Sequence, residues 1–523
     1  MQATPGISPM MVLQEKHIRI IAVLISFALS AWAVYSDGIV NRDGILYLQA
    51  AKQLTQGQWS SALALYDWPF YSGLIALISQ AAGLGLETSA QLLNALLFAL
   101  TVYVFIGLVG ELGGNRKVLV AAGLVILLHP QLNEHRADIF RDNGYWAFYL
   151  LAVWLFIKYY KLPQLRYALA WGIAIFVTIL FRIEGVAFLC LLPLTLLFKR
   201  DLNLPRRLLT LAGAWLLGFV GLLLLLVGWV INPEAVMHNI GRLDEPLRWV
   251  GYLWHGLSGH LQEQAARLSQ AILNQYSENH ALHAVIAALI AILAFGVFSA
   301  LSLVYAVLIF HSFISGTFRT FLAVDMQRII IGLVAINLVV LSLFLLKMFF
   351  LTGRYPMPLA LTLMLVLPFH LIALQDRWRM GQIRPLVRTL YLALAGLAVV
   401  AVCVDGLVTF GPSKQHIKMA GLWIAHEAPA SARLYTNDEV VAYYAGRWQP
   451  IDYDGFNETL RQLREGGWRN FDYLAIRAKK HDKALETAAR QAVGQEPVKV
   501  FVNNHGERLL IFQTHSRSNG RQP

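Results

Sequence analysis

Long apolar stretches separated by short polar segments make up the first 410 residues of the chain. A run of ~20 apolar residues matches a helix that crosses a bilayer, whereas strands of a membrane barrel alternate apolar and polar positions. The pattern therefore predicts an α-helical polytopic membrane domain over residues 1–410, with about eleven transmembrane helices. The expected spans are 18–36, 90–111, 117–131, 145–160, 166–181, 185–198, 208–231, 281–310, 328–350, 356–375 and 389–410.

Basic residues cluster in every second connection between these spans, at 115–117, 158–166, 199–207, 319–328 and 377–388. Because Lys and Arg concentrate in cytoplasmic loops, this alternation predicts a cytoplasmic N-terminus and a C-terminus on the periplasmic side of the inner membrane. It requires that the short, Gly-punctuated segment 69–86 stays at the interface without crossing. Three segments then face outward: 37–89, 132–144 and 232–280.

The last part of the chain has a different composition. Residues 411–523 contain 28 charged positions out of 113, whereas the preceding 410 residues contain 46. About a quarter of a typical soluble domain is charged, so we expect a small soluble α/β domain that begins near Gly411. Its expected elements are a helix at 417–427, a strand at 433–436, a helix from Asp438, a strand at 473–476 and a hairpin of 499–502 with 508–512.

The overall composition excludes several classes of protein. The chain is 57% hydrophobic and 14% charged, which excludes a cytosolic enzyme and a disordered chain. The net charge of +12 is explained by basic cytoplasmic loops, so we expect no nucleic-acid partner. Neither a dinucleotide or P-loop glycine motif nor an H-E-x-x-H motif occurs, so we expect no nucleotide and no structural metal.

Ionisable residues at the ends of spans are costly and therefore indicate function. The first such group is Arg42, Asp43 and Tyr47, just after the first span, where Asp43 and Tyr47 share one face of an expected helix. Asp43 at a helix start has a simpler explanation, because an aspartate there caps free N–H groups and interacts favourably with the helix dipole.

Three further groups lie in the same outer layer. They are Asp138 with Arg141 and Asp142 in the second outer segment, Arg182 with Glu184 between two apolar runs, and Arg354 with Tyr355 where a span ends. The Arg–Asp neighbours of the second segment could form a satisfied ion-pair network, and Arg354 could contact lipid headgroups. Together, however, carboxylates and guanidiniums in one layer can deprotonate an acceptor and bind a phosphate.

These stretches, taken in order, resemble the GT-C fold glycosyltransferases that use polyprenyl-phosphate-linked sugars. That superfamily includes the protein O-mannosyltransferases and the lipid A aminoarabinose transferase. The resemblance rests on Asp43–Ala51, Asp67–Leu74, Arg141–Asp142, Phe181–Gly185 and Gly353–Tyr355. The chain departs from the family pattern at two positions. Gly44 stands where many members carry a second acid, and Asn143 replaces a proline that often follows the second-loop aspartate.

The resemblance implies an integral-membrane hexosyl- or pentosyltransferase that moves a sugar from a polyprenyl-phosphate donor to a glycan, lipid or protein acceptor by inverting single displacement. Asp43 would be the catalytic base. Arg354, Tyr355, Arg182 and Arg141 would bind the donor phosphate, with Asp142, Glu184, Tyr47, Arg42 and Asp138 in acceptor-binding or supporting roles. No metal ligand set is expected, although an Asp-bound divalent cation stays open.

Two other functions fit the same composition. A transporter or flippase of lipid-linked sugars would place its charges near the bilayer midplane rather than at the span ends. A glycan polymerase or ligase would depend on a large outer loop such as 232–280, which carries Arg242, Arg248, His255 and His260. The sequence leaves open the sugar, the acceptor, the oligomeric state and the role of the C-terminal domain.

Overall fold

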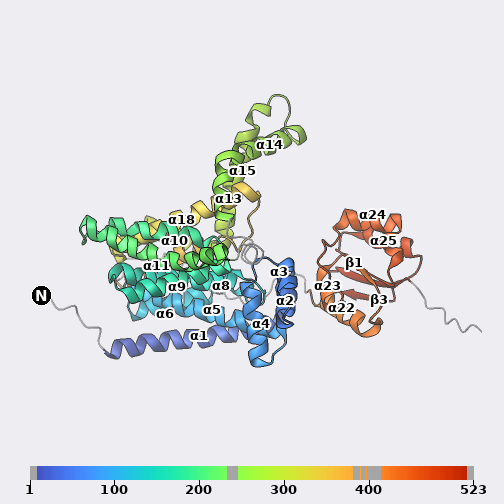
Figure 1. Ribbon diagram of the computed structural model, residues 1–523, viewed down its shortest axis with the longest axis horizontal. Coiled ribbons are helices and arrows are strands. Elements are labelled where there is room, and N and C mark those ends of the chain that lie inside the picture. Colours follow the sequence, from blue (N-terminus) through green and yellow to red (C-terminus); the bar gives the residue numbers. More distant parts are fainter. Residues whose placement is uncertain are drawn as a thin grey trace, which may run out of the picture.

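The computed structural model describes residues 9–231, 245–380 and 414–514, together with the single positions 389, 396 and 400. Most of the expected span 389–410, the expected domain start at Gly411 and residue Arg242 lie outside the described residues. Helices form the first part of the molecule, and a four-stranded sheet lies in the second (Figure 1). We call residues 414–514 the tail domain.

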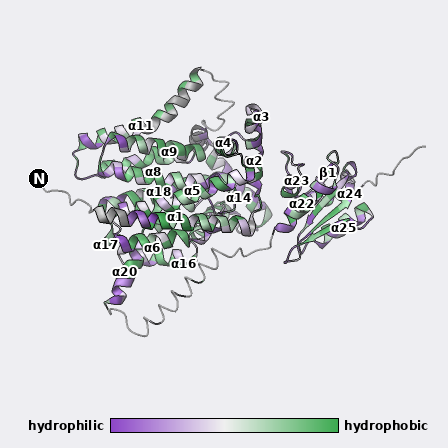
Figure 2. Ribbon diagram, turned by 90° about the horizontal axis from the view of Figure 1, so that it is seen from below, coloured by the Kyte–Doolittle hydropathy of each residue, from purple (hydrophilic) through white to green (hydrophobic). Residues whose placement is uncertain are grey.

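The helices of the first part form a bundle around a core of large buried side chains, among them Trp146, Trp171 and Phe105. Five described helices are long and apolar enough to cross a membrane: Glu15–Ser36, Leu86–Glu111, Glu278–Leu301, Val324–Met348 and Met357–Arg379. Figure 2 shows mainly hydrophobic positions along α1, α5 and α9 and hydrophilic positions at the end of α20. The protein is thus a membrane protein, while the number of eleven spans stays a prediction.

The elements that lie mostly within the expected spans are α1 (Pro9–Asp37), α5 (Leu86–Glu111), α6 (Arg116–Leu127), α8 (Asp142–Lys161), α9 (Leu165–Phe181), α10 (Gly185–Leu191), η1 (Leu192–Phe198), α11 (Leu204–Ile231), α15 (Ala281–Leu301), α16 (Leu303–Ile314), α18 (Val324–Met348), α19 (Met357–Met364) and α20 (Leu367–Arg379). The elements that lie mostly or wholly between the expected spans are α2 (Arg42–Thr55), α3 (Trp59–Leu65), α4 (Phe70–Ala82), α7 (Pro130–Glu134), α13 (Glu245–Gly251), η2 (Tyr252–Gly256), α14 (Leu257–Ala271), η3 (Glu278–His280) and α17 (Thr317–Phe321). The helix α4 has 13 residues, and that segment 69–86 stays at the interface remains a prediction.

Helix α15 corrects one sequence prediction. The expected single span 281–310 is interrupted at Ser302, whose φ of 62° ends α15 before α16 begins. Figure 1 shows α15 standing across the long axis of α8 and α9. Its Leu289 packs in a small cluster with Leu345, near the C-terminal end of α18. The stretch is apolar as predicted, but nothing in the hydropathy pattern around Ser302 indicates that the helix ends there.

The tail domain is an α/β sandwich. Its elements are α22 (Gln415–Glu427), β1 (Leu434–Thr436), α23 (Glu439–Tyr444), α24 (Phe456–Glu465), η4 (Gly467–Asn470), β2 (Tyr473–Ala478), α25 (Lys483–Val493), β3 (Lys499–Val502) and β4 (Arg508–Gln513). The strand order is β1-β2-β4-β3, with β1 parallel to β2 and the other pairs antiparallel. The strands coincide with the predicted ones, whereas α24 and α25 were not predicted.

The alternation of side chains along the strands builds two apolar layers in the tail domain. Ala475 and Leu509 pack with α22 and α23 on one face, while Leu474 and Leu510 pack with α24 and α25 on the other. Figure 1 shows the tail domain beside the end of the bundle that carries α2, α3 and α4. We call this the tail-side end, and the predicted site lies there.

Candidate functional site

Helix α2 brings Asp43 to an arginine that lies 311 residues further along the chain. Asp43 Oδ2 accepts a hydrogen bond from Arg354 Nη1 at 2.5 Å. Asn41 is the N-cap residue of α2, and its side chain makes no capping hydrogen bond. Asp43 lies in the first turn of this helix, so a favourable interaction with the helix dipole stays an alternative beside its ion pair with Arg354. The contact of Arg354 with lipid headgroups also stays an alternative.

A second charged group lies where α8 begins and α9 ends. The Arg182 guanidinium donates to the carboxylates of Asp142 and Glu184, and its side chain is only 7% exposed. Burial raises the pKa of the Glu184 carboxyl, but the positive charge of Arg182 outweighs burial and leaves this pKa below its usual value. Arg182 thus holds two ionised carboxylates from different segments.

Aromatic rings connect the two ion-paired groups. The Tyr355 ring centroid lies 4.5 Å from Arg182 Cζ and 5.5 Å from Arg354 Cζ, so both guanidiniums contact one ring. The centroid of the Phe140 ring lies 4.5 Å from Arg354 Cζ. A cavity of about 30 Å³ lies among Asp142, Arg182, Arg354 and Tyr355, which is room for roughly one water molecule.

Arg141 differs from the other arginines of this layer. It is half-buried, and its guanidinium lies 5.8 Å from the centroid of the Tyr66 ring. Among the residues that the structure describes, Arg141 forms no ion pair, whereas Arg182 and Arg354 each do. The buried Tyr47 ring packs edge-on against Tyr66 and so lies on the same side of the layer. Arg141 is thus a guanidinium whose charge the described residues leave unneutralised by direct contact.

The structure places two of the predicted site residues outside this layer. Arg42 is 67% exposed and pairs with Glu439 of the tail domain at 3.3 Å. Asp138 pairs with His135 at 2.9 Å. The alternative of a local ion-pair network among Arg136, Asp138, Arg141 and Asp142 is wrong, because none of their charges pairs with another in that set.

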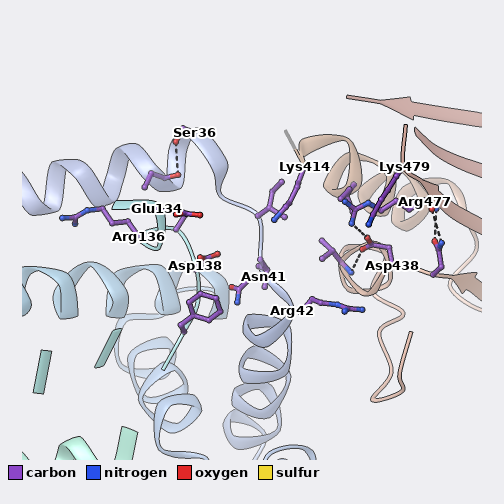
Figure 3. Close-up of a pocket in the computed structure, with 18 of the residues that line it drawn as sticks. Ser36, Asn41, Arg42, Glu134, Arg136, Asp138, Lys414, Asp438, Arg477 and Lys479 are labelled. Carbon is purple, nitrogen blue, oxygen red and sulfur yellow. Dashed lines mark hydrogen bonds and ion pairs between the residues drawn. The ribbon is translucent and has the colours of Figure 1, made fainter. Parts of the chain in front are cut away.

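A larger cavity of about 800 Å³ lies between the tail-side end of the bundle and the tail domain (Figure 3). Its wall in the bundle includes Trp32 and Asp138, and its wall in the tail domain includes Lys414 and Lys479. Phe140 lines this cavity and also contacts Arg354. The Phe140 ring therefore lies between this cavity and Arg354.

Sequence reasoning missed several residues of the site. Phe140 and Tyr145 flank the Arg141–Asp142 pair along the chain, and adjacency to charged residues was the available signal. Tyr145 lies 5.9 Å from Arg182 Cζ. Tyr66 is brought in from the first outer segment by tertiary packing alone, so its sequence surroundings gave no indication.

The ligand set for a metal is poor in this region. Asp43 and Asp142 each face a guanidinium, which occupies the space where a cation would bind. Within the described ranges, no group of three or more His, Cys, Asp and Glu side chains lies close enough to hold a metal ion. Asp43 and Asp142 are engaged by arginines in this structure, and a divalent cation at the site stays an open alternative.

Comparison with known proteins identifies the fold. No family model matches the sequence, and no curated protein sequence matches it. Among solved structures, the chain is similar to the archaeal oligosaccharyltransferase AglB from Archaeoglobus fulgidus in complex with an inhibitory peptide and a dolichol-phosphate. The TM-score is 0.56 and the identity 12%, over 97% of this chain and 75% of that chain.

A second structure of the Archaeoglobus fulgidus oligosaccharyltransferase, in complex with Zn and sulfate, matches with a TM-score of 0.54 and 13% identity over 93% of this chain and 73% of the other. ArnT from Cupriavidus metallidurans bound to undecaprenyl phosphate matches with a TM-score of 0.40 and 15% identity, over 99% and 100% of the two chains. The chain therefore has the GT-C fold of membrane glycosyltransferases, as the sequence motifs implied.

Proposed function

We propose that the protein is an integral-membrane glycosyltransferase that moves a sugar from a polyprenyl-phosphate donor to a cell-envelope acceptor on the outer face of the inner membrane. The observation that carries the proposal is the Asp43–Arg354 pair beside the Arg182 group at one end of a GT-C bundle. A relative in fold, the archaeal oligosaccharyltransferase, binds dolichol-phosphate and a peptide.

Asp43 acts as the base in a single inverting displacement. It accepts the proton of an acceptor hydroxyl while the hydroxyl oxygen bonds to the anomeric carbon of the sugar. The bond from that carbon to the phosphate oxygen breaks, and its electron pair leaves with the polyprenyl phosphate. Asp43 is bonded to Arg354, so a donor phosphate that takes over Arg354 would release the carboxylate toward the acceptor.

Arg354 and Arg141 bind the departing phosphate. Arg141 has no carboxylate partner among the described residues and so is ready to pair with an anion. Arg182 is already bonded to Asp142 and Glu184, which suits it to positioning the layer rather than to binding the donor directly. Tyr355 contacts both Arg182 and Arg354 and fixes the distance between them.

The larger cavity is the proposed entrance for the acceptor. Only the Phe140 ring separates it from Arg354 in the described structure, and its lining includes both Arg42 and Asp138. One wall, with Leu29 and Trp32, is apolar, and the tail-domain wall carries Lys414 and Arg477. This arrangement gives Arg42 and Asp138 a role toward the acceptor rather than the donor.

The remaining parts of the proposal concern the membrane. Residues 1–410 form the catalytic domain with a cytoplasmic N-terminus, and residues 411–523 form a periplasmic domain. Reporter fusions after Arg116 and at Pro523 should report opposite sides, with Pro523 outside. Two cytoplasmic signals would contradict the topology and, with it, the outer position of the site.

Asp43→Asn tests the mechanism. Asn keeps the size of Asp but cannot accept the proton, so transfer should fall at least ~100-fold while the protein still folds. The assay is mass spectrometry of envelope glycans and polyprenyl-phosphate sugars from cells that carry the wild type, the variant or no gene. Arg354→Lys is the companion variant, because it keeps the charge but loses the forked geometry that suits phosphate. Normal turnover by Asp43→Asn would move the role of base to another carboxylate, with Asp142 next.

The same assay separates the alternatives. A flippase would change the side on which the lipid-linked sugar accumulates without forming a new glycosidic bond, and a polymerase or ligase would transfer whole glycans instead of one sugar. The bonded trio Tyr149, Asn337 and Thr362 inside the bundle is uncharged, whereas the buried Arg136 donates to Ser26 and Ser30 of α1. The ion-paired carboxylates and arginines of the proposed site lie where helices begin or end, which favours the transferase over a transporter with charges at the midplane.

A further inference from the structure

The chain segment 38–42, which leads directly into Asp43, is in contact with the tail domain. Lys418 Nζ donates to the Gly38 carbonyl at 3.1 Å, and the Val40 amide donates to Tyr444 Oη at 3.1 Å. Arg42 pairs with Glu439 at 3.3 Å. Three alternate residues of the segment are thus held from α22 and α23, and two of the contacts involve the backbone itself.

The groups that make these contacts are themselves fixed. Tyr444 Oη also donates to Glu87 at 3.5 Å, and Lys418 lies 3.8 Å from the same carboxylate, so both side chains bridge to the start of α5. Trp448 Nε1 donates to Glu439 at 2.9 Å. Tyr443, Tyr444 and Trp448 also pack against the apolar core of the bundle, which makes α23 the docking helix of the tail domain.

On its other side, the segment is tied to the second outer loop. Asn41 Oδ1 accepts from the Ile139 amide at 2.7 Å. A Cβ at Gly44 would lie 2.8 Å from Asn41 Oδ1 and 2.9 Å from Ile139 Cβ, so the contact is too close for a side chain. This explains why Gly44 stands where the family pattern has an acid, and it leaves segment 38–44 little room to shift.

We propose that the tail domain positions the base: through Tyr444 and Lys418 it holds segment 38–42 so that Asp43 meets Arg354 at the reacting centre. The role of Asp43 in this proposal rests on the proposed function. The contacts by which the tail domain restrains segment 38–42 do not depend on that function. Tyr444 and Lys418 are positioning residues that touch neither donor nor acceptor. The exposed Arg42–Glu439 pair is expected to add less, because solvent screens it.

The test combines hydrogen exchange with steady-state kinetics on the full chain in detergent. Tyr444→Phe keeps the ring but removes the acceptor of the Val40 amide, so exchange of peptides covering 38–48 should rise. The kcat of transfer should fall about 10-fold to 100-fold, with the KM for the donor unchanged, because a displaced base slows chemistry without weakening binding. Lys418→Met should act in the same direction.

Tyr453→Phe is the matched control, since its hydroxyl contacts Gln449 within the tail domain and not the segment. It should change neither exchange at 38–48 nor kcat. Unchanged exchange at 38–48 in Tyr444→Phe would show that the tail domain does not restrain this segment. Raised exchange with a normal kcat would show that the restraint does not position the base. A raised acceptor KM with normal kcat would assign the tail to substrate binding instead. If the wild type transfers no sugar at all, the proposed function fails. The exchange data would still show whether the tail domain restrains segment 38–42.

Discussion

The bundle and the tail domain each contain an arginine that bridges two carboxylates. Arg182 joins Asp142 and Glu184 in the bundle, whereas Arg477 joins Asp438 at 2.7 Å and Glu507 at 2.8 Å in the tail domain. The composition of the two groups is alike, and sequence inspection would not rank one above the other. Their surroundings differ. The difference makes the bundle group a candidate functional site and the tail group an ion-pair network that stabilises the local structure.

The carboxylates of the tail group already serve the local structure. Asp438 accepts hydrogen bonds from the Val440 and Val441 amides at the start of α23, and Glu507 accepts from Asn503 in the β3–β4 turn. The bundle group instead lies beside a second ion pair and beside Arg141, which has no ion-pair partner among the described residues. A cluster of charged side chains indicates a reactive site when one of its charges has no ion-pair partner within the described structure. The number of charges in the cluster does not by itself indicate such a site.

Arg182→Met should have the largest effect of three variants that probe this comparison. It leaves the buried carboxylate of Asp142 and the half-buried one of Glu184 without their partner, and breaking a buried pair costs about 3–5 kcal/mol. We expect a sharp loss of folded protein in size-exclusion chromatography and loss of transfer. Arg182→Lys, which keeps the charge, should recover part of the folded yield. Normal yield for Arg182→Met would show that the buried carboxylates are neutralised by another group.

Arg141→Met should affect activity and leave the fold unchanged. The side chain has no ion pair to lose among the described residues and only a long contact of 5.8 Å with the Tyr66 ring, so the melting temperature should fall by no more than a few degrees. If Arg141 pairs with the donor phosphate, kcat/KM for the donor should fall roughly 10-fold to 100-fold. A fall in melting temperature with normal kinetics would place Arg141 with the structural arginines.

Arg477→Met should have the smallest effect on transfer and a moderate one on stability. Its two carboxylates keep other partners, since Asp438 still caps α23 and His416 lies 3.6 Å from Glu507. We expect a loss of about 1–3 kcal/mol in the free energy of unfolding, measured by thermal denaturation. Below the melting temperature, kcat should stay within about twofold of the wild type, and only the KM for the acceptor should change, because Arg477 lines the proposed acceptor entrance. A collapse of kcat in folded protein would erase the distinction between the two groups.

The sequence by itself determined the membrane character and the sheet of the tail domain, and it predicted one layer of charged residues. Charged residues that end apolar runs must lie near the same level of the bilayer, so Asp43, Asp142, Arg182, Glu184 and Arg354 could be expected to lie near one another. The tertiary structure decided which of them meet. It paired Asp43 with Arg354 and turned Arg42 toward the tail domain. It also set α15 across the bundle and placed Tyr444 on the segment before Asp43. The physical reason is that hydropathy fixes the position of a residue along the bilayer normal, while its lateral neighbours depend on how helices pack, which no single stretch of sequence encodes.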